Sequence, residues 1–119
     1  MKKPGKYEST LEATILSLDL VTQMDKTNFL ELRDAAYKID VVREQLRDAA
    51  ERLAERCTTF ARDVADGRVH MTPVTNSSLI GDIAQYTAVL NEKTESFPTM
   101  LRFVLGPTAA KEFYGILRS

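Results

Sequence analysis

The feature that most constrains the fold is a stretch from about residue 28 to residue 66 that contains no proline and no glycine. Thr27 or Asn28 is suited to cap its start, Glu31 lies where a capping-box acid belongs, and Gly67 follows as a natural C-terminal cap. Inside the stretch, apolar residues recur at alternating spacings of three and four and form a heptad seam: Leu32, Ala35, Ile39, Val42, Leu46, Ala49 and Leu53. The stretch therefore predicts one long helix. Because such a helix projects beyond a compact domain of this size, we expect it to pack as a hairpin or a coiled coil.

A second helix, from about residue 78 to residue 96, is predicted after a polar connection. The connection contains Gly67, Pro73 and Asn76, and Ser77 or Ser78 is placed to cap the helix that follows. Pro98 marks either a kink or a fresh helix start, and Gly106 with Pro107 ends the next apolar run. A short final helix is expected over about residues 108 to 117. The pattern predicts a mainly all-α fold in which the long helix forms a hairpin with the second helix, beside short C-terminal helices.

The opening segment, residues 10–22, supports two interpretations. Leu11, Ile15 and Leu18 have helical spacing, whereas Leu16, Leu18 and Leu20 alternate with polar residues as in a strand. Threonines at positions 10, 14 and 22 favour the strand slightly. Both alternatives remain open at this stage.

Composition places the chain among soluble globular proteins. The length of 119 residues predicts a single helical domain over residues 1–119. The composition, 44% apolar and 28% charged residues, predicts that this domain has a folded core. A net charge of −1 argues against nucleic-acid binding through bulk electrostatics. No apolar run is long enough to span a membrane, and residues 11–21 are unlike a signal-peptide core because Glu12, Ser17 and Asp19 interrupt them. A single cysteine, Cys57, allows no internal disulfide and fits a reducing compartment, so a cytoplasmic location is expected.

No motif for catalysis, cofactor binding or metal binding is present in the sequence. His70 is the only histidine and falls in the connection, so we interpret it as a loop residue. Cys57 follows the apolar side of the long helix and is expected to be a buried small hydrophobic residue rather than a nucleophile. Glu51 and Glu55 lie among arginines, which indicates a solvated salt-bridge face. We therefore expect a protein without enzymatic activity, cofactor or metal.

Aromatic residues and methionine are concentrated near the C-terminal end of the sequence. One interpretation, which we favour, is that short helices fold back and bury these side chains in the core. The other is a groove for a partner helix, because aromatics and methionine are enriched at interfaces. The candidate protein-binding residues are Phe97, Met100, Phe103, Leu105, Phe113 and Tyr114.

Residues 103–115, FVLGPTAAKEFYG, resemble the end of small tail assembly chaperones of long-tailed phages and prophages of Gram-positive bacteria. In that family, an aromatic-rich helix reaches a glycine and is followed by a short alanine- and lysine-containing helix and an aromatic–glycine pair. Gly106, Ala110, Lys111, Tyr114 and Gly115 match this pattern. The specific match covers about a dozen residues, and the rest of the chain is similar in layout.

The resemblance implies a chaperone that coats the long helical tape measure protein and keeps it soluble while the tail tube assembles. A groove on a helical hairpin is suited to an amphipathic client helix, and the heptad seam leads us to expect a homo-oligomer. Two alternatives remain. The chain is a small helical regulator that inhibits a folded host or defence protein, or it is a structural component of the virion.

Overall fold

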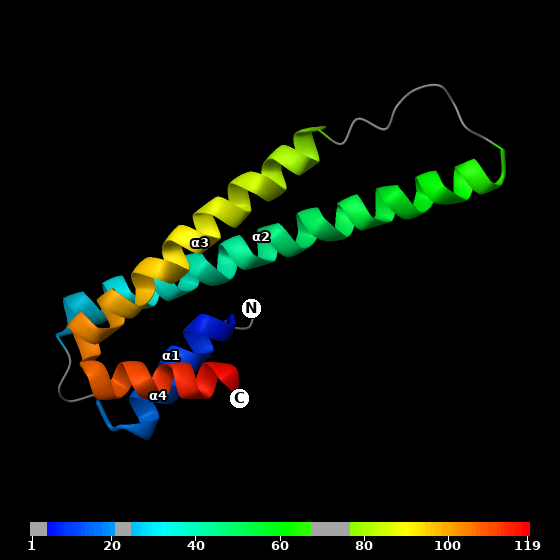
Figure 1. The fold of residues 1–119 in the computed structure, drawn as a ribbon. Helices are drawn as coiled ribbons and strands as arrows, with labels where there is room; N and C mark the ends of the chain where they lie inside the picture. The colour runs from blue at the N-terminus through cyan, green and yellow to red at the C-terminus, as the bar shows by residue number, and fades with distance from the viewer. Residues whose placement is uncertain (1–4, 21–24, 68–76) are drawn as a thin grey trace.

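The structure is a computed structural model that describes residues 5–20, 25–67 and 77–119. The described residues form four α-helices (Figure 1). The helices are α1 (Lys6–Ser17), α2 (Lys26–Ala65), α3 (Ser77–Leu105) and α4 (Pro107–Arg118). None of the described residues forms a strand. The predicted all-α class, with a long helix packed in a hairpin, is therefore confirmed.

The opening segment forms a helix, α1, rather than a strand, although residues 21 and 22 lie outside the described part of the chain. Tyr7, Leu11 and Ile15 recur every four residues and are all buried, so one helical face packs on the core. Thr14, which favours a strand by its intrinsic propensity, is fully buried and donates its hydroxyl hydrogen to the carbonyl of Thr10 at 2.8 Å. Burial of this face outweighs the small propensity of threonine for strands.

The long helix α2 begins slightly earlier than predicted because a different residue caps it. Asp25, not Thr27 or Asn28, is the N-cap, and its carboxylate accepts hydrogen bonds from the backbone N–H groups of Thr27 and Asn28 at 2.9 and 3.5 Å. At the other end, Gly67 adopts a φ of 71°, which glycine tolerates best, directly after the C-cap residue Asp66. The predicted cap at Gly67 is thus confirmed.

Helix α3 continues without a break through Pro98 to Leu105 and is therefore longer than the predicted helix ending near residue 96. The two residues Phe97 and Leu101 are both buried, and this packing holds the helix together where proline removes one backbone hydrogen bond. The chain turns at Gly106, whose φ is 92°, and Pro107 then takes the first position of α4. The predicted stop at this glycine–proline pair is confirmed.

The hydrophobic core lies at one end of the molecule, where α1 and α4 pack against the start of α2 and the end of α3 (Figure 1). All four helices contribute buried side chains, namely Tyr7, Leu11, Ile15, Leu32, Ala36, Ile39, Phe97, Leu101, Ala110 and Phe113. The remainder of the α2–α3 hairpin projects from this bundle. The molecule measures 66 × 26 × 22 Å, and its radius of gyration of 19.8 Å far exceeds the ~14 Å typical of a compact chain of this length.

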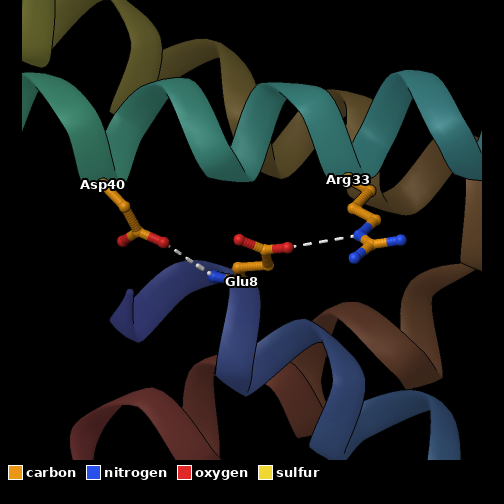
Figure 2. Close-up of polar contacts among 3 residues, drawn as sticks. All are labelled: Glu8, Arg33 and Asp40. Atoms are coloured by element: carbon orange, nitrogen blue, oxygen red, sulfur yellow. Dashed lines mark hydrogen bonds and ion pairs between the residues drawn. The ribbon is translucent and has the colours of Figure 1, made fainter. Parts of the chain in front are cut away.

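Polar contacts fix how α1 lies on α2 (Figure 2). The carboxylate of Asp40, on α2, accepts hydrogen bonds from the backbone N–H groups of Tyr7 and Glu8 at 2.9 and 3.0 Å and so caps the start of α1 from outside. Two turns earlier on α2, the Arg33 guanidinium pairs with the Glu8 carboxylate at 3.2 Å. Gly5 allows the approach, because a Cβ atom there would overlap the Asp40 side chain.

Candidate protein-binding surface

The aromatic residues of the C-terminal region form a cluster inside the core. The ring of Phe97, on α3, lies 5.3 Å from that of Phe113, on α4, and Tyr7 from α1 approaches both at 5.4 and 5.6 Å. Tyr114 packs edge-on against Phe113 at 5.0 Å. These separations are those of favourable aromatic pairs. Three helices are therefore joined through one aromatic cluster.

Phe97 and Phe113 are almost completely buried, so neither side chain is available to a partner unless the core opens. Of the two interpretations of the aromatic-rich segment, burial in the core is therefore the one that fits Phe97 and Phe113. Tyr7 was not among the residues predicted to belong to this cluster. Its four-residue spacing to Leu11, and from there to Ile15, is the signal that places it on the buried face of α1.

Tyr114 and Leu105 are half-buried and pack against the edge of the core. The Tyr114 hydroxyl oxygen is buried and has no hydrogen-bond partner among the described residues. Burial raises the pKa of Tyr114 to about 12, with the nearby Tyr7 adding to the rise and Arg102 opposing it. Burial likewise raises the pKa of Tyr7, while Arg43 lowers it and Asp40 raises it. Both tyrosines therefore stay neutral further into the alkaline range than a solvent-exposed tyrosine does.

Met100 and Phe103 are the two candidate residues that face solvent. Phe103 is 82% exposed and Met100 is 37% exposed, and a spacing of three places them on adjoining turns of one side of α3. No other large apolar side chain among those described is as exposed as Phe103. An aromatic ring left in water at this level is the kind of feature that marks an interaction site.

Beside Met100, a shallow groove of about 240 Å³ runs between α2 and α3. Ile39 and Phe97 lie buried beneath it, whereas Ala35 and Met100 are its more accessible apolar side chains. Charged side chains stand along its edges, among them Glu31, Asp34, Lys38 and Lys93. Lys38 and Asp34 form an ion pair at 2.9 Å on the α2 edge. An apolar floor with charges of both signs at its rim is suited to an amphipathic helix that carries its own charged flanks.

The structure corrects the predicted environment of Cys57, whose thiol is exposed instead of buried. The reason is the unequal length of the hairpin helices, because α2 continues past the start of α3 and its last turns have no helix packed on them in the described residues (Figure 1). His70 lies outside the described residues. No group of histidine, cysteine, aspartate or glutamate side chains in the described ranges is arranged to hold a metal ion.

The helices of the described residues include none that is both long and apolar enough to cross a bilayer. Glu51 and Glu55 are exposed, and the neighbouring surface of α2 carries pairs such as Arg47 with Glu44. This is the solvated charged face that the sequence predicts. The surface that distinguishes the molecule is thus the exposed pair Met100 and Phe103 with the groove beside them.

Comparison of the chain with protein family models, with curated proteins and with solved structures gave no match.

Proposed function

We propose that this protein is a tail assembly chaperone, similar to those of long-tailed phages and prophages of Gram-positive bacteria, that binds the tape measure protein and keeps it soluble. In this proposal the protein works in the cytoplasm of the producing cell and acts by binding, without catalysis, a cofactor or contact with nucleic acid or membrane. The resemblance of residues 103–115 to that family supplies the identity of the client.

The observation that carries the proposal is the exposure of Phe103 and of Met100, the second of which lines the groove between α2 and α3. A client helix whose apolar stripe lies across these two side chains would remove their surface from water, at about 25 cal/mol per Å² of apolar area. Two exposed side chains and one shallow groove provide a small contact. We therefore expect weak binding at each site.

Weak binding at each site suits a chaperone that must later be displaced. A tape measure protein is a long helical chain, so many copies of a small protein can bind along it, and the combined effect of many contacts keeps the client coated. Polymerising tail-tube subunits can then remove one copy at a time. A tight single contact would instead fit an inhibitor of one folded protein.

Co-expression with the tape measure protein of the same genome tests the proposal, with the soluble, co-purifying fraction of that client as the measurement. We expect the parent chain to keep the client soluble and Phe103→Asp to abolish this effect, because a carboxylate there cannot be buried against an apolar stripe. Leu16→Asp is the matched control, since Leu16 on α1 is 75% exposed and lies outside the proposed surface. Phe113 is unsuitable for this test because it belongs to the core.

Three results would contradict the proposal or part of it. If the parent chain leaves the client insoluble, the chaperone function is wrong and the inhibitor and virion-component alternatives become the leading ones. If Phe103→Asp solubilises the client as well as the parent does, the proposed surface is wrong. If Leu16→Asp fails together with Phe103→Asp while both remain folded by circular dichroism, the effect does not belong to the Met100–Phe103 surface.

A further inference from the structure

We propose that the far end of α2, residues 50–65, is a self-association surface on which a second copy of this chain docks in antiparallel orientation. We call this segment the arm. The inference rests on the structure of the arm and does not depend on which client the protein binds.

The arm carries an apolar face that is left open to solvent. Leu53, Cys57, Phe60 and Val64 follow one another at spacings of four, three and four, so they form a stripe along one side of the helix. Phe60 is 44% exposed and Val64 is 47% exposed, and the thiol of Cys57 is exposed as well. Leu53, at the start of the stripe, is half-buried. The stripe is therefore covered at its beginning and open beyond it.

This stripe continues the seam by which α2 packs on α3. The seam is buried as far as Ala49, and the stripe keeps to the same side of α2 after it. A helix of 40 residues is about 60 Å long and one of 29 residues about 44 Å, so α2 has several turns more than α3 is able to cover. The end of α2 accordingly projects past the start of α3 (Figure 1). The kind of surface that packs on α3 earlier in α2 is thus exposed in the arm, against which no further helix of the described residues lies.

The charges beside the stripe fit a second copy in antiparallel orientation. Arg56 and Asp63, one heptad apart, lie along the same flank of the stripe, whereas Ala54 and Ala61 occupy the other flank. In an antiparallel pair, each flank faces the equivalent flank of the other helix. A two-fold axis near residues 59 and 60 would place Arg56 opposite Asp63 of the second copy, and Asp63 opposite Arg56 of the second copy. The flank is therefore complementary to itself, as a two-fold symmetric interface requires.

A parallel pair would not use these charges. In that arrangement each flank faces the opposite flank of the partner, so Arg56 would lie beside Ala61 of the second copy and Asp63 would face no residue of the arm. In the antiparallel pair, the alanines of the two copies face each other, and their small side chains let the two backbones approach closely along that side. The paired segment is about 24 Å long, which makes the interface small, so we expect a reversible dimer with a micromolar dissociation constant.

Sedimentation equilibrium of the full chain over a range of concentrations, with a reducing agent to keep Cys57 from forming disulfides, is the first test. We expect a monomer–dimer equilibrium. Phe60→Asp should raise the dissociation constant by at least about tenfold, because it places a carboxylate in the apolar stripe. Circular dichroism establishes that this variant keeps its helix content, as expected for an exposed position.

Charge reversal is the second test, because it reports the orientation of the pair. Arg56→Asp alone and Asp63→Arg alone should each weaken self-association by about tenfold or more, since like charges then face each other twice. Mixing the two variants should restore association as a heterodimer, in which every facing pair is again of opposite sign. The double variant carrying both changes should associate like the parent. Glu55→Arg, on the opposite side of the arm, is the matched control and should leave the dissociation constant unchanged.

The proposal is overturned if the parent chain remains a monomer at every concentration reached. It is equally overturned if Phe60→Asp dimerises as well as the parent, because the interface then lies elsewhere. If the two charge-reversed variants do not recover association when mixed, the antiparallel orientation is wrong.

Discussion

At the residue scale, two glycines show how position decides the effect of one added methyl group. Gly5 approaches Asp40 so closely that a Cβ atom there would overlap the carboxylate that caps α1. Gly81, inside α3, has nothing within contact distance of the same atom. One glycine is needed for a close approach, whereas the other only weakens a helix.

We predict opposite effects for the two alanine substitutions. Gly5→Ala should lower the free energy of unfolding by about 1–3 kcal/mol, because α1 must shift away from its cap. Gly81→Ala should raise it by about 0.5–1 kcal/mol, because alanine restricts the unfolded chain and favours a helix. Urea denaturation followed by circular dichroism measures both. Equal effects would show that Asp40 does not hold α1 in the described manner.

Phe113 and Phe103 allow a buried and an exposed aromatic side chain to be compared. Phe113→Ala should cost about 3–5 kcal/mol of unfolding free energy, because it leaves a cavity in the aromatic cluster. Phe103→Ala, at a position that is 82% exposed, should change stability by less than about 0.5 kcal/mol. The same denaturation experiment compares them. A large loss of stability from Phe103→Ala would remove the argument that its ring is free to bind a client.

The buried tyrosines predict a loss of stability at alkaline pH. The pKa of Tyr114 is about 12 in the folded protein and 10 in the unfolded chain. The stabilisation that comes from keeping this hydroxyl neutral is therefore complete below pH 10 and is lost as pH rises through 12. The pKa of Tyr7 is raised in the same direction. Tyr114→Phe should keep or slightly raise stability at pH 7, by up to about 1 kcal/mol, since the buried hydroxyl has no partner.

The measurement for Tyr114→Phe is a series of urea denaturation curves between pH 7 and pH 11. The variant should lose less stability than the parent across the alkaline end of this range. If both lose stability in parallel, ionisation of Tyr114 is not what destabilises the fold there.

At the element scale, α2 combines a packed half and an open half in one helix. Leu32, Ile39 and Val42 are buried near the bundle, whereas nearly every residue after Leu53 is exposed. Local stability follows buried apolar contact, so the two halves should open with different free energies. The caps at Asp25 and Gly67 hold the ends but add no packing between them.

Hydrogen exchange should resolve this difference along α2. In dilute solution we expect amides of residues 54–65 to exchange at least about tenfold faster than those of residues 32–46, because the latter open only with the core. Mass spectrometry of peptic fragments provides the comparison. Uniform protection along α2 would contradict it, and slower exchange of the arm at higher protein concentration would agree with self-association.

At the scale of the whole molecule, the chain separates a small core from a projecting hairpin. Every helix contributes to the core at one end, where α1 and α4 are joined to the hairpin. The Met100–Phe103 surface lies near the bundle, and the arm lies at the far end of α2. The surfaces proposed for client binding and for self-association therefore lie in different parts of the molecule, and substitutions can disrupt them separately.

Small-angle X-ray scattering tests the projecting shape. At concentrations where the chain is monomeric, we expect a radius of gyration near 19.8 Å. A value near 14 Å, typical of a compact chain of this length, would show that the hairpin folds back on the bundle in solution. A rise in this value with concentration would accompany pairing through the arm.

The sequence by itself determined the helical class, the long seam of α2, its cap at Gly67 and the break at Gly106–Pro107. These features depend on local spacing and on backbone preferences, which neighbouring residues already specify. Local rules also explain the near misses, because Asp25 competes with Thr27 and Asn28 as a cap and all three are good caps.

Only the tertiary structure decided which apolar residues are covered. Phe97 and Phe103 are similar in sequence context, yet one is buried and the other is exposed, because α2 and α4 pack against one side of α3 and the Tyr7 ring contacts that of Phe97. Cys57 is exposed because α3 is shorter than α2, and the opening segment is a helix because Tyr7, Leu11 and Ile15 complete the core. Burial depends on where distant segments end and meet, and no local pattern contains that information.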